Sequence, residues 1–260
     1  MATINQTFDF KRFGNLSKKY FIENWRRMSI MFGCVTILMI LMLLFLEHIS
    51  YRVSSGQIFV AFAVITFVYG VVMASNMYRS LGSPATAITT LTCPASQFEE
   101  FLLRWIIAVP LFLIWAYVSA LFADWVRMLY AHIMNHPADA ADWGMLLTSD
   151  GEELDKIGFL DTNLGSFLSD FLCVQSFFLL GSVVWLKNAL VKTLGAMFLI
   201  WLSYMFVTIG YATLIVDEVN YYEKNFDLEM VSTVLGIGVT LFNYLLTYMR
   251  FREAEIINRW

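Results

Sequence analysis

The chain has 260 residues, of which 59% are hydrophobic and 17% aromatic, and its formal net charge is −4. A soluble domain is rarely so apolar, and the apolar residues come in blocks of about 20, the length a helix needs to cross a hydrocarbon core. We therefore expect an all-α integral membrane protein. The three cysteines lie far apart in the sequence, which argues against a disulfide framework or a zinc site.

The first segment, residues 1–27, carries a two-sided pattern. At about 100° per residue, residues 8–27 form a helix with aromatic side chains on one side and basic side chains on the other. The two sets are Phe10, Phe13, Tyr20, Phe21 and Trp25 against Lys11, Arg12, Lys18, Lys19 and Arg26. We expect an amphipathic interfacial helix on the anionic inner leaflet, which Gly14 and Asn15 could interrupt. A soluble arm with its aromatic residues tucked into the bundle is the alternative.

Six apolar runs follow, at residues 28–46, 58–77, 101–123, 167–186, 189–216 and 230–249. Because every backbone polar group must be satisfied within the segment in lipid, each run predicts a transmembrane helix. The expected organisation is a six-helix domain over 28–249 and a tail over 250–260. The first run starts only after several basic residues, so we expect the N-terminal segment to be retained rather than removed as a signal peptide.

The basic residues predict the orientation. Of the 17 Lys and Arg residues, 13 fall on the side of the two termini and 4 on the other side. This asymmetry places both termini in the cytoplasm. It also places an acidic loop, residues 124–166, on the outer side.

The cytoplasmic connection after the second run, residues 79–105, contains the sequence TCPASQFEEFLLRW at 92–105. Ser96 followed three residues later by Glu99 is a capping-box pattern, and acidic residues in a first turn complement the helix dipole. Pro94 just before this start is a fitting stop for the preceding segment. The segment therefore predicts at least a helix that begins at the membrane surface.

Glu99, Glu100 and Arg104 also satisfy EExxxR, a pattern that resembles one motif of membrane-embedded CAAX-type proteases. That chemistry needs histidines facing the carboxylates. The only close pair, His132 and His136, follows the third run and is expected on the opposite membrane face. These histidines are more simply solvated loop residues than a metal site.

The chain lacks the common motifs of nucleotide and hydrolytic chemistry. The dipeptide Gly-Lys is absent, so no P-loop is present, and neither HExxH nor GxSxG occurs. We expect that the chain is not an enzyme, that it holds no metal or cofactor, and that any ATP hydrolysis belongs to a separate subunit.

Two motifs suggest a family. The sequence FDFKRFG at 8–14, PASQFEEFLLRW at 94–105 and the six-span layout with both termini inside resemble the permease subunits of ABC-2-type transporters, particularly a group found in Bacteroidetes bacteria. In that group, leucine is usual at the position of Cys93 and lysine at the position of Glu100. The likeness in layout covers nearly the whole chain, and the motif likeness covers about 20 residues.

The resemblance implies a permease in a bacterial inner membrane that exports an apolar or amphipathic substrate. Its partners would be a separate ATP-binding subunit, a second permease chain in a homodimer or pseudo-dimer, and membrane lipids, with no nucleic acid. Segment 79–105 would be the coupling segment, with its contacts at Leu81, Pro84, Phe98, Glu99 and Glu100. The alternative is a membrane scaffold or assembly protein that does not transport and acts through its outer acidic loop.

Overall fold

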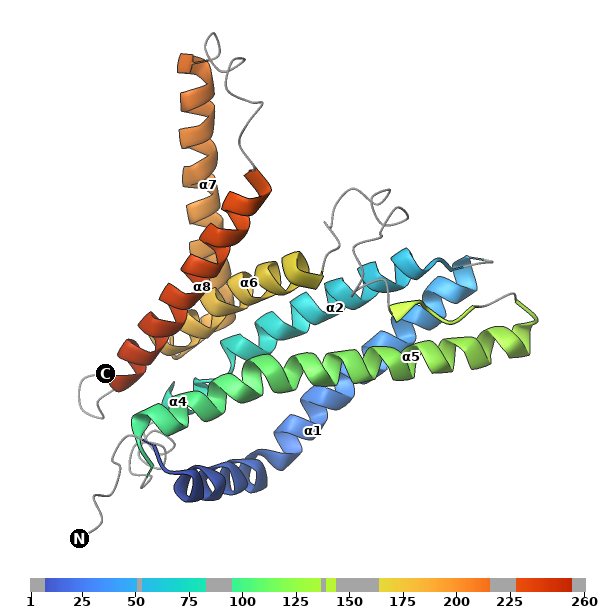
Figure 1. Cartoon of the computed structure of the whole chain (residues 1–260), viewed down its shortest axis with the longest axis horizontal. Helices are drawn as coiled ribbons and strands as arrows, with labels where there is room; N and C mark the ends of the chain where they lie inside the picture. The colour runs from blue at the N-terminus through green and yellow to red at the C-terminus, as the bar shows by residue number, and fades with distance from the viewer. Residues whose placement is uncertain are drawn as a thin grey trace. The chain divides into compact units, whose positions relative to one another are not determined.

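The computed structural model describes residues 8–50, 53–82, 95–136, 139–143, 164–215 and 228–253, and within these ranges all regular structure is helical. In chain order the elements are α1 (Phe10–Ile49), α2 (Ser55–Ser75), η1 (Arg79–Gly82), α4 (Gln97–Ile106), η2 (Ile107–Leu111), α5 (Phe112–Met134), α6 (Leu164–Val184), α7 (Ala189–Ile215) and α8 (Leu228–Arg252) (Figure 1). η1 is a 3-10 helix and η2 is a π-helix.

Counted over the described residues, six helical stretches are long and apolar enough to cross a membrane. They are Phe10–Ile49, Ser55–Ser75, Gln97–Met134, Phe167–Val184, Ala189–Val207 and Thr233–Arg252. Each overlaps one of the six predicted spans. The prediction of an all-helical chain with six helices of membrane-spanning length is therefore confirmed for these residues.

The first helix is longer than the predicted span. α1 starts after the N-cap Asp9, whose side chain accepts from the Lys11 N–H, and continues for 40 residues through Gly14. The division expected at residue 27 falls inside this helix, and Figure 1 shows that its first turns run in a different direction from the rest. At about 1.5 Å per residue, α1 is ~60 Å long, roughly twice the thickness of a hydrocarbon core.

The third predicted span, 101–123, is also longer in the structure. α4, η2 and α5 follow one another without a break from Gln97 to Met134. Pro110 lies within η2, where the wider π turn accommodates a residue that has no N–H to donate. We call this continuous helical stretch the α4–η2–α5 rod. It ends at Asn135, whose left-handed backbone (φ 56°) forms the C-cap.

The chain divides into two compact units. Unit 1 comprises Met1–Met73 and Leu91–Phe171, and unit 2 comprises Ala74–Thr90 and Leu172–Trp260. In unit 1, α1 packs lengthwise against α5. The polar contacts between these helices come in the same order along both, namely Phe32 with Trp115, Thr36 with Ser119, Glu47 with Arg127 and His48 with Tyr130. The two helices therefore run parallel, as the first and third spans of a membrane bundle must.

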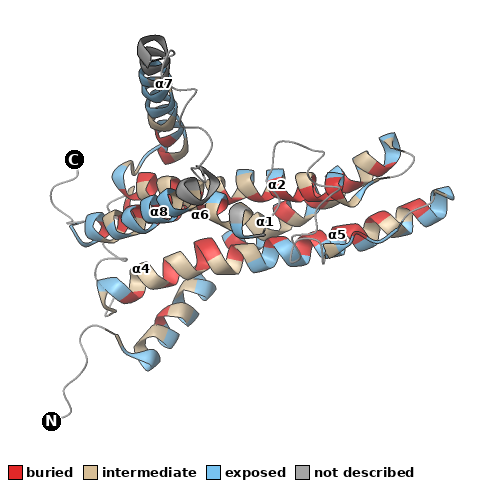
Figure 2. Cartoon of the chain, turned by 45° about the horizontal axis from the view of Figure 1, so that its top comes forward, coloured by how far each residue is buried: buried red, intermediate tan, exposed pale blue. Residues whose placement is uncertain are grey.

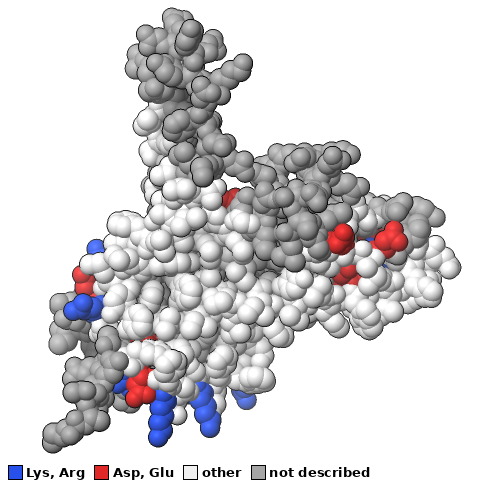
Figure 3. Space-filling view, viewed as in Figure 1, with Lys and Arg blue, Asp and Glu red and all other residues white. Residues whose placement is uncertain are grey.

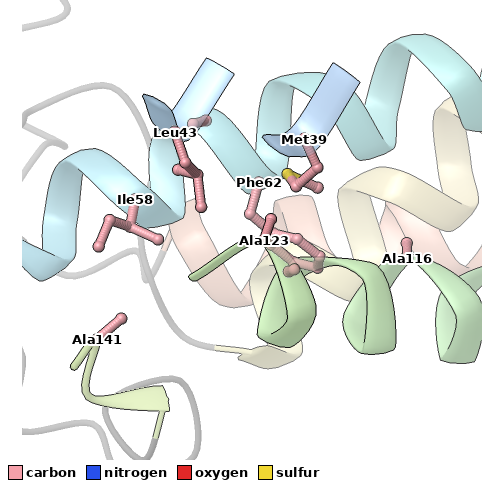
Figure 4. Packing of buried hydrophobic residues seen from close by; sticks show 9 residues of the cluster. Met39, Leu43, Ile58, Phe62, Ala116, Ala123 and Ala141 are labelled. Atoms are coloured by element: carbon pink, nitrogen blue, oxygen red, sulfur yellow. The ribbon is translucent and has the colours of Figure 1, made fainter. Parts of the chain in front are cut away.

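The core of unit 1 depends on small residues of α5. Ala116, Ala120 and Ala123 recur at helical spacing on one face, and all three are fully buried. Met39 and Leu43 of α1, with Ile58 and Phe62 of α2, fill the space above them (Figure 4). Small side chains let helix backbones approach closely, which is how helices associate in lipid.

The outer surface of unit 1 is apolar along its middle. Ile37 and Phe45 of α1 are each 58% exposed, and Ile114 of α5 is 63% exposed (Figure 2). On the face in view, the charged side chains over α1 and α5 lie near the ends of the helices, with an uncharged surface between (Figure 3). Such a surface is unfavourable in water and is suited to lipid.

Unit 2 contains η1, α7, α8 and most of α6. Gly181 of α6 lies against Thr193 of α7 so closely that an added Cβ would overlap the Thr193 Oγ1. Asn243 of α8 donates from Nδ2 to the Ser176 hydroxyl of α6 at 2.9 Å, and both side chains are buried. Close approach at glycine and a buried amide contact between helices are typical of packing in membranes.

Candidate functional site

The predicted helix start at Ser96 is present. The Ser96 hydroxyl accepts from the Glu99 N–H at 3.1 Å, and Glu99 Oε2 accepts from the Ser96 N–H at 2.9 Å. These two reciprocal bonds form a capping box, and Glu99 and Glu100 occupy the first turn of α4. The capping prediction is therefore confirmed.

Glu99 also joins α4 to the start of α1. Its Oε2 accepts from Arg12 Nε at 2.7 Å, and its Oε1 accepts from Arg12 Nη2 and from the Asp9 N–H, each at 2.8 Å. The Glu99 side chain is 0% exposed, whereas that of Arg12 is 28% exposed. With the Ser96 N–H, four donor groups therefore surround one buried carboxylate, which holds two segments 87 residues apart in the sequence together.

Aromatic side chains extend this junction. The ring centroid of Phe8 lies 6.5 Å from that of Phe98 and 4.9 Å from that of Phe10. Phe10 is 84% exposed and Phe98 is 38% exposed. We call Phe8, Phe10 and Phe98 the aromatic patch. Exposed apolar side chains beside charged groups mark a surface suited to contact with a protein or a membrane.

Glu100 makes a separate ion pair. Its Oε1 accepts from Arg104 Nη2 at 2.6 Å, one turn along α4, and the side chains are 13% and 4% exposed respectively. Both carboxylates of the EExxxR motif are thus paired with arginines. His132 is 32 positions further along the continuous α4–η2–α5 rod, which corresponds to ~48 Å at about 1.5 Å per residue, so the structure does not bring it to these carboxylates.

Of the other two expected contacts, the structure describes one. Leu81 lies in η1, which belongs to unit 2, and it is 6% exposed. Pro84 lies outside the described residues. The structure therefore gathers Phe98, Glu99 and Glu100 in one helical turn, with Leu81 in a different unit.

Sequence reasoning missed Arg12 as a site residue. Arg12 was assigned only to the basic side of an amphipathic helix, yet it is the main partner of Glu99. A signal was present, because Asp9 and Arg12 lie one turn apart within FDFKRFG, the motif associated with the family resemblance.

Sequence reasoning also missed a polar cluster near the other end of unit 1. Arg127 donates from Nη1 to Glu47 Oε2 at 3.0 Å and from Nε to Asp124 Oδ1 at 2.8 Å, and all three side chains are buried. The spacing of Asp124 and Arg127, three residues apart on an apolar helix, was the available signal. Within the ranges that the structure describes, no group of three or more His, Cys, Asp or Glu side chains is arranged to hold a metal ion.

Comparisons of the chain with protein-family models, with curated proteins and with solved structures find no match. The class of protein is therefore given by the fold. Over the described residues it is all-helical, with six helices of membrane-spanning length, which indicates a multi-pass membrane protein.

Proposed function

We propose that the chain is the permease subunit of an ATP-driven transporter of the ABC-2 type, with ATP hydrolysed by a separate subunit. One observation supports the proposal most. The two sequence segments that resemble the family, 8–14 and 94–105, lie far apart in the chain yet share the Arg12–Glu99 ion pair and the contact of Phe8 with Phe98. The two segments thus present one composite surface for docking.

In this proposal the residues have different roles. Phe98 and Phe10 supply exposed apolar area, and aromatic residues are enriched among those that dominate binding energy at protein interfaces. Glu99 is buried and fully hydrogen-bonded, so it positions Phe98 and α1 rather than contacting the partner itself. Glu100, with its partly exposed side chain, is a contact at the edge of the patch. Leu81, which is buried in unit 2, is not assigned to this surface.

The helical rod offers a route from docking to the membrane. α4 begins at the docking surface and continues through η2 into α5 without a break. α1 is tied to this rod at one end by Arg12 and Glu99 and near the other end by Glu47 and Arg127. A movement of the partner against α4 would therefore shift α1 and α5 together, as rigid elements do in domain closure.

The proposed setting is a bacterial inner membrane with both termini in the cytoplasm. The first turns of α1 expose Lys11, Lys18 and Lys19, and we propose that they lie on the anionic inner leaflet. The substrate is apolar or amphipathic and is exported. A second permease chain completes the pathway as a homodimer or pseudo-dimer, because one chain with six spans offers little enclosed volume.

The test is copurification of a P-loop subunit with single variants of the full chain. We expect Phe98→Ala and Arg12→Gln to lose the subunit, the first by removing contact area and the second by releasing Glu99. Phe122→Ala is the matched control, because Phe122 is 48% exposed on α5, well away from α4, and should keep the subunit.

Equal recovery of the subunit with Phe98→Ala and Phe122→Ala would contradict the docking role of the patch. Absence of any P-loop subunit from the unmodified chain would favour the scaffold alternative. Of the acidic loop 124–166 on which that alternative depends, the structure describes residues 124–136, 139–143 and 164–166.

A further inference from the structure

A short stretch of chain after α5 packs against α5 and α2, at the end of unit 1 away from Ser96. We call residues 139–143 the strap. The Asp139 carbonyl accepts from Arg127 Nη2 at 2.6 Å, and the Ala141 N–H donates to Asp124 Oδ2 at 3.1 Å. The Asp142 N–H reaches the Ser55 hydroxyl of α2 at 3.4 Å. The strap is thus held to α5 and α2 through its backbone.

Two strap side chains enter the bundle. Ala141 is 8% exposed and belongs to the same core cluster as Phe62 and Ala123 (Figure 4). The ring of Trp143 stands edge-on to Phe59, Phe62 and Tyr117, with centroid distances of 5.2, 5.9 and 5.8 Å. Trp143 therefore fills the space between α2 and α5 that the strap covers. Its indole Nε1 is buried and has no hydrogen-bond partner among the residues described.

Arg127 is the centre of the attachment. It binds Glu47 of α1, Asp124 of its own helix and the strap carbonyl of Asp139 at the same time. Its side chain is 1% exposed, and those of Glu47 and Asp124 are 0% and 5% exposed. One guanidinium thus faces two buried carboxylates, and charges are costly to keep out of water. Moving the strap away would leave these ion pairs intact and would let water reach them, because the strap meets Arg127 and Asp124 through the Asp139 carbonyl and the Ala141 N–H.

The cluster also lacks one donor. Glu47 Oε2 is bound by Arg127, but Glu47 Oε1 is buried and no described residue donates a hydrogen bond to it. His136 lies beside this oxygen, with its Nδ1 3.9 Å from Glu47 Oε1. A protonated imidazole at this position would supply the missing charge and donor.

Other charged and titratable groups also lie at this end of unit 1. His48 Nδ1 lies 3.2 Å from the Tyr130 hydroxyl, and His132, Asp139 and Asp142 are exposed. The described charged and titratable residues at this end of α1 and α5 and in the residues after α5 are His48, Asp124, Arg127, Tyr130, His132, His136, Asp139 and Asp142. Among these, His136 is the histidine in ion-pair range of Glu47.

We propose that the strap is a closure that opens and shuts, that Arg127 is its latch, and that protonation of His136 tightens it by pairing with Glu47. The opened strap would expose the aromatic side chains around Trp143. The inference depends on contacts within unit 1 and does not require the proposed docking of an ATP-binding subunit.

The test compares two adjacent alanines of the strap. Ala140 is exposed and Ala141 is buried, so Ala140→Cys and Ala141→Cys are matched probes in full-length chains whose Cys34, Cys93 and Cys173 are replaced by serine. Each chain is placed in nanodiscs, which expose both membrane faces, and its labelling rate by a water-soluble maleimide is measured. The ratio of the Ala141→Cys rate to the Ala140→Cys rate removes the pH dependence that the two thiols share, and the same ratio in His136→Asn controls for the rest.

At pH 8 we expect this ratio to be about one-tenth or less, because labelling of a buried site requires opening. Arg127→Gln should raise it at least about threefold, and Arg127→Lys, which keeps the charge without the forked contacts, should give an intermediate rise. A ratio near one in the parent would overturn the closure. An unchanged ratio in both Arg127 variants would overturn the latch.

The pH arm tests His136. The ratio should fall between pH 8 and pH 6 in the parent and stay constant in His136→Asn. A fall of equal size in His136→Asn, or no fall in the parent, would overturn the role of His136. If Arg127→Gln does not fold, Arg127→Lys still tests the latch and His136→Asn still tests the role of His136.

Discussion

Replacing Arg127 with methionine should strongly destabilise unit 1. The substitution keeps most of the side-chain length but leaves the buried carboxylates of Glu47 and Asp124 without their cation. Removing one partner of a buried ion pair typically costs about 3–5 kcal/mol, because the remaining charge is uncompensated. For a chain of this size about 1 kcal/mol corresponds to roughly 2–4 °C, so the expected fall in melting temperature is about 6–20 °C.

The assay is thermal unfolding of the purified full chain in detergent, followed by the helical circular dichroism signal. The decisive comparison is the triple variant Glu47→Met, Asp124→Asn and Arg127→Met, which removes all three charges and keeps an acceptor for the Ala141 N–H. Apolar replacement of a whole buried network is often neutral, so the triple variant should recover most of the loss. A melting temperature for Arg127→Met equal to that of the parent, or a triple variant no better than Arg127→Met, would refute this reasoning.

Two further predictions concern packing and orientation. Gly181→Ala should destabilise the chain by about 1–3 kcal/mol because the new Cβ would overlap Thr193, whereas Gly195→Ala, whose Cβ meets nothing within 4 Å, should stabilise it by about 0.5–1 kcal/mol in the same melting assay. Equal effects would contradict the close approach at Gly181. In chains lacking other cysteines, Ala140→Cys should react with an impermeant maleimide outside intact cells, and Lys19→Cys only after permeabilisation. The reverse pattern would overturn the proposed orientation.

The helical spans could be predicted from the sequence because lipid leaves the backbone few alternatives. An uncharged run such as residues 28–46 has to form a helix to satisfy its own N–H and C=O groups. The capping box at Ser96 was equally accessible, because it depends on two residues three positions apart. Both predictions use information contained within a single turn or a single run.

The partners of the buried charges could not be predicted in this way. Glu99 pairs with Arg12 across 87 residues and Glu47 pairs with Arg127 across 80, and both pairs depend on α1 lying parallel to the α4–η2–α5 rod. The periodicity of apolar residues predicts that a segment is helical, but it does not predict which other helix packs against it. The end of the third span was predicted too early for a related reason. Asp124 and Arg127 suggest a loop in the sequence, but in the structure they form a hydrogen-bonded ion pair within α5.

The proposed function requires that this chain docks a separate ATP-binding subunit. The most direct measurement is purification of the tagged, unmodified chain from its native host in mild detergent, with identification of copurifying proteins and an ATP hydrolysis assay. The proposed function predicts a stoichiometric P-loop subunit and measurable hydrolysis. A chain that purifies without an ATPase, also after crosslinking, would contradict the transporter assignment.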